Sequence, residues 1–291
     1  MEKEIVVGGQ AVIEGVLMRT KNYSVIAVRK PDNGIELISE KLEAKKGFDF
    51  IFLRGIVMLF ESMRLGIKAL SSSANIAGQE DSMTKKDVFI AFSFAAVFAV
   101  SLFIILPFFV TSVILKDRGV LFNIVDGLIR LAFFLAYLFF VSQIPDIRRV
   151  FQYHGAEHKA VNAYEAGKKL MVQEVKKYST AHLRCGTNFM LIVMILSILL
   201  FSLITGPVWL RIASRIILIP VVAGLSYEVL KLIARFEKNQ FVRIFAYPGL
   251  MLQRLTTREP DESQIEVSIA ALKKALELER DYSSPTKVSS R

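Results

Sequence analysis

The amino-acid sequence predicts an all-α polytopic membrane protein with about four transmembrane helices, one interfacial helix and a small N-terminal β-hairpin region. The first observation is composition: 53% of the 291 residues are hydrophobic and only 22% are charged, which is more apolar surface than a soluble domain can cover. The second is patterning, because the apolar residues come in long uncharged blocks, as in helices surrounded by lipid. The third is a set of short β-like runs with turn signals near the N-terminus.

Residues 1–47 are expected to form a cytosolic segment that contains β-structure. The β-like runs cover residues 5–7, 24–29 and 35–39. Gly8-Gly9 is interpreted as a turn, and the Pro, Asp, Asn and Gly of residues 31–34 predict a hairpin between the last two runs.

Residues 48–86 are expected to form an amphipathic helix followed by a polar linker. Charged residues of the helical part, including Glu61 and Lys68, fall within about 80° of one another on a helical projection, and apolar residues fill most of the rest. Such a helix is too charged to span a bilayer. It either lies in the membrane interface or is buried against its own protein, and the sequence leaves both possibilities open.

The first two transmembrane helices are expected within residues 87–145. Residues 88–115 carry no charged side chain, and the next span covers roughly residues 120–145. The second span contains Asp126 and Arg130, one helical turn apart, which can pair on one face. This pair is either structural or part of an intramembrane pathway.

Two further transmembrane helices are expected within residues 187–234. The third covers about residues 187–210. The fourth has only 12 residues between Arg215 and Glu228, and Pro220 interrupts them, so it crosses the bilayer only if flanking basic side chains extend to the surfaces.

The remaining two segments are expected to be cytosolic. Residues 146–186 form a loop rich in Lys and Arg, which the positive-inside rule assigns to the cytoplasm, so an even number of spans leaves both termini cytoplasmic. Residues 235–291 form a helical tail whose last helix runs from about residue 262 to 280. Its apolar stripe consists of Ile265, Ile269, Leu272 and Leu276.

The formal net charge of +10 is attributed to this membrane topology. Basic residues flank membrane helices on the cytoplasmic side and contact anionic lipid head groups. The basic residues are scattered and no nucleic-acid-binding motif is present, so direct nucleic-acid binding is not expected. The expected partners are the lipid bilayer and further copies of the chain in a homo-oligomer, and the substrate is unknown.

Every histidine and the single cysteine lie within residues 154–185. His154 and His158 are four residues apart, so on a helix they project from one face and can share a metal ion. Glu157 completes an H-x-x-E-H sequence, in which the glutamate polarises a water. His182 and Cys185 follow in an H-x-x-C sequence and can supply further ligands. Imidazole and thiolate ligands favour zinc, or another divalent transition metal, over magnesium or calcium.

The sequence is compatible with two kinds of metal site. If three of these groups bind and water takes the fourth position, the site can hydrolyse a substrate with Glu157 as the general base. If all four bind, the coordination is closed and the ion is structural.

Four stretches of the sequence resemble the YqhQ-like family of bacterial membrane proteins, a family of unknown function labelled as predicted metal-dependent enzymes. These stretches are residues 8–19, 153–159, 182–187 and 255–261. The resemblance covers nearly the whole chain, although Leu183 stands where the family usually has proline. It implies a multi-pass protein of the bacterial cytoplasmic membrane with a bound metal, and it adds Glu14 and Arg19 as candidate site residues.

The first functional hypothesis is therefore a membrane-embedded zinc hydrolase with a cytosol-facing site. The alternative is a non-enzymatic oligomeric scaffold or channel with a structural metal. A third possibility is an ion or transport pathway through Asp126, Arg130 and Glu228, an intramembrane carboxylate at the cytosolic end of the short fourth span.

Overall fold

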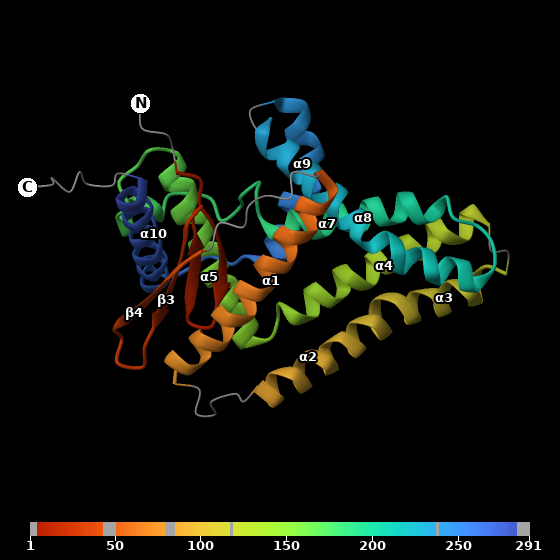
Figure 1. Cartoon of the computed structure of the whole chain (residues 1–291), viewed down its shortest axis with the longest axis horizontal. Helices are drawn as coiled ribbons and strands as arrows, with labels where there is room; N and C mark the ends of the chain where they lie inside the picture. Colours follow the sequence, from red (N-terminus) through yellow and green to blue (C-terminus); the bar gives the residue numbers. More distant parts are fainter. Residues whose placement is uncertain (1–4, 43–50, 79–84, 117–118, 237–238, 284–291) are drawn as a thin grey trace, which may run out of the picture.

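The computed structural model describes residues 5–42, 51–78, 85–116, 119–236 and 239–283. Figure 1 shows two parts, a sheet with helices α5 and α10 against it, and a bundle of long helices beside it. The chain is mostly helical, but the N-terminal strands make the expected all-α class too narrow.

The described N-terminal residues form a four-stranded antiparallel sheet in the order β1-β2-β3-β4. The strands are β1 (Gly8–Val12), β2 (Gly15–Arg19), β3 (Tyr23–Arg29) and β4 (Ile35–Lys41). The hairpin at residues 31–34 is confirmed, because β3 and β4 pair on either side of it. The turn expected at Gly8-Gly9 is wrong: both residues lie in β1, where Gly9 pairs with Met18. The turn is instead at Ile13-Glu14, and Glu14 adopts a φ of 51°.

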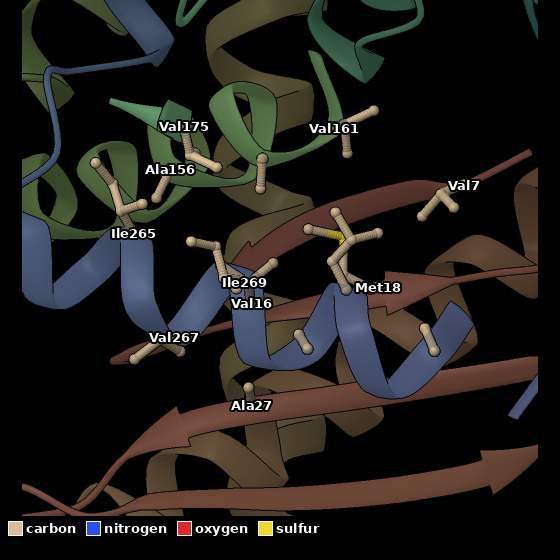
Figure 2. Packing of buried hydrophobic residues seen from close by; sticks show 14 of the residues in the cluster. Val7, Val16, Met18, Ala27, Ala156, Val161, Val175, Ile265, Val267 and Ile269 are labelled. Atoms are coloured by element: carbon tan, nitrogen blue, oxygen red, sulfur yellow. The ribbon is translucent and has the colours of Figure 1, made fainter. Parts of the chain in front are cut away.

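Helices α5 (Pro145–Glu165) and α10 (Glu262–Ser283) pack against the sheet and against each other. The apolar stripe predicted for the last helix is confirmed, because Ile265, Ile269, Leu272 and Leu276 are all buried in one core. Figure 2 shows this core, in which Val16 and Met18 of β2 lie close to Ile269 of α10. The segment expected to be a loop is thus largely helix, since α5 is followed by the short α6 (Val172–Val175).

Three helices in the described part of the chain are long and apolar enough to cross a membrane. The first, Phe89–Ile114, is formed by α2 (Lys85–Val100), the π-helical η1 (Ser101–Ile105) and α3 (Leu106–Ile114). The second is α4 (Val120–Val141). The third is the apolar part, Ile217–Arg235, of α8 (Val208–Arg235), which continues through Pro220.

The two C-terminal spans differ in length from the expectation. Helix α7 (Gly186–Ser202) ends well before residue 210 and is a shorter apolar helix of 17 residues. Helix α8 has 28 residues, so it is longer than its stretch of 12 uncharged residues suggested. Figure 1 shows α4 and α8 running along the same bundle.

Helix α1 (Ile51–Ile76) is in part buried against its own protein, and its place in a membrane interface stays a prediction. One face packs against α8 and the sheet, where a side chain on Gly55 would lie 3.1 Å from the Cα of Gly224. Glu61 accepts a hydrogen bond from Arg19 at the end of β2. The opposite face leaves large apolar side chains such as Phe60 and Met63 exposed.

Helix α9 (Gln240–Thr256) lies in the tail that was expected to be helical, although its bounds were not predicted from the mixed polarity of this segment. It contacts α7 and, more weakly, α4 and α8. Figure 1 shows it projecting from the side of the bundle. Its last residue, Thr256, reaches the candidate metal centre described next.

Candidate metal centre

Helix α5 and the start of α7 bring three potential metal ligands together. His154 and His158 lie one turn apart on α5, with their ring centroids 4.4 Å from each other. Cys185 is the N-cap residue of α7. One ligand atom from each of these three residues lies within 4.8 Å of the other two, and the group can hold a metal ion.

Backbone carbonyl groups orient both imidazole rings. Nδ1 of His154 lies 2.8 Å from the carbonyl oxygen of Thr256, and Nδ1 of His158 lies 2.5 Å from that of Thr180. Because a carbonyl oxygen only accepts hydrogen bonds, each Nδ1 carries the proton, and in a neutral ring Nε2 then presents a lone pair. This is the arrangement of metal-binding histidines, whose second nitrogen donates to a fixed acceptor.

Burial keeps His158 in the required neutral form. Its ring is almost completely buried, which lowers its pKa well below the usual value, and the neighbouring His154 lowers it further. Nε2 of His154 lies 3.3 Å from Sγ of Cys185, so one imidazole lone pair points to the thiol.

Cys185 has surroundings that suit a thiolate only when a cation is present. Burial raises the pKa of its thiol to about 11, although hydrogen bonds from Thr187 act in the opposite direction. The backbone N–H of Thr187 lies 3.4 Å from Sγ, at the N-terminus of α7, where the helix dipole favours negative charge. A bound metal deprotonates a coordinating thiol outright.

Glu157 lies beside the three ligands but outside the group itself. Its Oε2 is 3.6 Å from Nε2 of His158, and burial raises the pKa of its carboxyl group. Strand β1 covers this side chain through Gly9, where a Cβ would lie 2.9 Å from Oε1 of Glu157. A glycine is therefore required at the position that was interpreted as a turn.

The donor set fits a divalent ion. The rings of His154 and His158 offer neutral nitrogen ligands, while Cys185 and Glu157 each carry one negative charge when deprotonated. Two buried negative charges are unfavourable without compensation, and one divalent cation balances them. Imidazole and thiolate together suit zinc.

The structure does not bring His182 into the same group. Nε2 of His182 lies 3.2 Å from Oε2 of Glu165, and Arg184 also pairs with Glu165. The ring centroid of His182 is 5.6 Å from that of His158, so it is a neighbour of the site. Three of the four predicted ligands are thus assembled in this geometry.

Polar side chains of α5 and α9 hold the segment that supplies the Thr180 carbonyl group. Buried Lys159 donates to the carbonyl oxygens of Lys176 and Tyr178, at 2.9 and 2.7 Å. Gln253 of α9 accepts from the backbone N–H of His182 at 2.9 Å and donates to its carbonyl oxygen at 2.8 Å. These contacts fix the path of the segment that runs from α6 to Cys185.

Gly155 allows the chain after α9 to lie directly on α5. A Cβ at Gly155 would meet the carbonyl oxygen of Arg258 at 2.1 Å, and the N–H of Arg258 donates to the carbonyl oxygen of Phe151. The close approach places Thr256 next to His154. The glycine between the two predicted ligands thus has a packing role that the spacing of the ligands did not reveal.

The three additional candidate residues lie outside the ligand group. Glu14 accepts hydrogen bonds from Arg149 and, at 3.3 Å, from the hydroxyl group of Tyr153, so it docks the β1–β2 turn onto α5. Arg19 pairs with Glu61 at 3.3 Å and joins the sheet to α1. Glu228 lies within α8. Their candidacy as site residues stays a prediction.

The residues that orient the ligands were missed at the sequence level. Thr180 and Thr256 act through carbonyl groups, which every residue type has, so no side-chain pattern identifies them. Gln253 lies in a helix whose bounds were not predicted. Thr256 and Gly155 do lie inside the stretches that carry the family resemblance, which was the one available signal.

Comparisons with known proteins agree with the resemblance seen in the sequence. A family model described as "Protein of unknown function (DUF1385)" matches residues 50–278, which include the whole ligand group. The chain is similar to the "Uncharacterized protein YqhQ" of Bacillus subtilis (strain 168), with 34% identity over 294 residues, covering 94% of this chain and 92% of that protein. No solved structure matches the chain.

Proposed function

Since the chain belongs to the DUF1385 family, whose description assigns no function, we propose from its own residues that it is a membrane-embedded, metal-dependent hydrolase. His154, His158 and Cys185 would bind zinc, or another divalent transition metal, and Glu157 would act as the general base. The observation that carries this proposal is the orientation of two imidazole rings by carbonyl groups toward one buried thiol.

The proposed chemistry divides between the ion and the chain. A divalent ion held by three protein ligands supplies Lewis-acid polarisation and a lowered pKa for water. Glu157 accepts the proton of the attacking water, because its carboxylate lies against the ligand group. Its raised pKa makes it a stronger base than an exposed glutamate and a competent acid for the leaving group.

The surroundings favour a substrate that is reached at a membrane surface. Cys185 begins the apolar helix α7, and α5 belongs to the sheet region, so the ligand group lies where the two parts of the molecule meet. The basic residues around this segment favour the cytoplasmic side. A hydrolase in this place would act on an ester or amide bond close to the inner leaflet.

The proposal is tested by metal content and hydrolysis in the purified protein. We expect about one zinc ion per chain by mass spectrometry, and hydrolysis of at least one member of a panel of ester and amide reporter substrates. Glu157→Gln should keep the metal and lower hydrolysis by about 10²- to 10⁴-fold, the usual contribution of a general base. A wild-type protein with far less than one metal ion per chain would refute the proposal.

A second candidate function, a structural metal in a non-enzymatic scaffold or channel, is favoured by one observation. The ligand group and its carbonyl partners join α5, the segment before α7, α7 itself and the end of α9, and most of these groups are buried. In that case Glu157→Gln should leave cellular function intact, whereas Cys185→Ser should lower thermal stability. The same Glu157 variant therefore separates the two candidates.

A further inference from the structure

A cavity of about 320 Å³ lies inside the bundle between α4 and α7. Aromatic side chains line it along much of its wall, among them Phe134 of α4 and Phe189 and Phe201 of α7. The cavity lies between two apolar helices, where hydrocarbon rather than water is the surrounding solvent. Its volume is in the range of small-molecule binding sites.

The cavity is elongated along α7. Its lining residues on this helix extend from Phe189 to Phe201 and include Met194 and Ser197, so they recur on the face turned toward α4. Twelve residues of α-helix correspond to about 18 Å. A volume of this size spread over that length is narrow and elongated.

The charges in its wall already neutralise each other. Arg130 donates to Asp126 at 2.8 Å, as an i, i+4 pair on α4, and both side chains are largely buried. A neutral pair gives little net attraction for an isolated ion. The ligand that fits is therefore uncharged and mostly hydrocarbon along its length.

The cavity begins close to the candidate metal centre. Cys185, the N-cap residue of α7, precedes the lining residue Phe189 by four residues, which is about 6 Å along the helix axis. A chain seated in the cavity would thus extend from the level of the ligand group into the bundle.

We propose that this cavity binds a single acyl chain and that the substrate of the hydrolase is lipid-linked. That the bound lipid is a substrate rests on the proposed hydrolase function. That the cavity binds an acyl chain does not depend on it. The acyl chain lies along α7, and its polar end, with the bond to be cleaved, lies toward Cys185. The same chain chemistry can come from a bulk phospholipid or from a single-chain amphiphile.

The test uses the whole protein in lipid nanodiscs with a palmitate analogue that carries a photoactivatable diazirine near the end of its chain. After illumination, mass spectrometry locates the adducts. We expect adducts on the cavity residues Phe134 and Met194 that saturate with the probe. Adducts on Phe94 and Leu199, whose side chains are 74% and 58% exposed, should instead rise in proportion to it.

Matched variants separate binding in the cavity from contact at the surface. Ser197→Phe fills the cavity and should reduce its adducts at least tenfold, and the milder Ser197→Leu should reduce them about threefold. Leu199→Phe, on the exposed side of the same helix, should leave them unchanged. Thermal unfolding and zinc content of each variant show whether it still folds.

The possible outcomes are distinct. Cavity adducts that palmitate displaces and phosphatidylglycerol does not would assign a single-chain ligand, and displacement by both would assign a phospholipid chain. Both results support the inference. Non-saturating cavity adducts, or adducts that persist in the folded Ser197→Phe and Ser197→Leu variants, would overturn it. In that case, normal zinc content would still support the proposed metal centre. Saturable cavity adducts in a protein without zinc would refute only the proposed hydrolase function.

Discussion

Two of the clusters of buried ionisable groups in the described part of the chain have their charges balanced in opposite ways. Within the bundle, Asp126 carries a negative charge that Arg130 on the same helix neutralises at 2.8 Å. At the meeting of the two parts, Cys185 and Glu157 are buried beside two imidazole rings, and burial raises the pKa of both acidic groups. The charges of the Asp126–Arg130 pair cancel each other within the chain. The second cluster becomes balanced when a divalent cation joins it.

This difference also explains what the sequence could predict. Asp126 and Arg130 are four residues apart, so their pairing follows from helical periodicity alone. The metal ligands come from two helices, and their orientation depends on carbonyl groups of two further segments. Tertiary contacts of this kind leave no local pattern.

The largest effect should follow from removing a ligand. We expect His154→Ala or Cys185→Ser to reduce the zinc content from about one ion per chain to almost none, because either change leaves two ligands. His182→Ala is the matched control, since its ring pairs with Glu165 instead of joining the group. Zinc is measured by mass spectrometry after size-exclusion chromatography. Equal zinc loss in all three variants would show that His182 is also a ligand.

A smaller effect is expected from disturbing the segment that orients His154. The side chain of Gly155→Ala would meet the carbonyl oxygen of Arg258 at 2.1 Å and push this segment away from α5. Overpacking of this kind costs about 1–3 kcal/mol, and loss of a ligand's hydrogen-bond partner weakens metal binding by about 10- to 100-fold.

Gly186→Ala is the control for this variant. A Cβ at Gly186 meets nothing within 4 Å, although the residue adjoins Cys185. Thermal unfolding and zinc competition with a chelator measure both variants. Equal affinity in Gly155→Ala and wild type would contradict the role given to Thr256.

The pH dependence of zinc binding should identify the thiol. Without metal the pKa of Cys185 is raised to about 11, so at pH 7–9 the thiol is protonated and must release its proton on binding. Affinity should therefore rise with pH, by about tenfold per pH unit from this group. The Cys185→Ser variant lacks this thiol, so its residual zinc affinity should rise less steeply with pH. The difference should correspond to about one fewer proton released per zinc ion bound. An unchanged slope would mean that sulfur does not bind the ion.

The smallest effect is expected in the bundle. Replacing Asp126→Asn and Arg130→Gln together should leave zinc content unchanged and alter stability only slightly, because a buried ion pair is often close to neutral against uncharged partners of similar size. Thermal unfolding and zinc analysis measure both properties. A loss of zinc in this double variant would show that the two buried clusters depend on each other.

The sequence predictions that the structure confirms depend on local contacts, whereas the features that were missed depend on contacts between distant residues. Three of the four expected apolar spans and the stripe of the last helix were predicted because each depends on residues close together in the chain. Gly9 was misassigned because its role depends on Glu157, about 150 residues away. The bounds of helix α9 were missed because its polarity reflects contacts with α7, α4 and α8, which are distant in the sequence. The H-x-x-E-H spacing identified both histidines, but only the fold separates His182 from Cys185.

X-ray absorption at the zinc edge tests the central claim most directly. The loaded wild-type protein should show one sulfur scatterer at about 2.3 Å and two imidazole nitrogens at about 2.0 Å, with a further light atom completing the coordination. Cys185→Ser, measured with excess zinc because it should bind the ion only weakly, should lose the sulfur scatterer. A zinc ion without sulfur in its coordination, in a protein that is folded and fully loaded, would contradict the assignment of this centre.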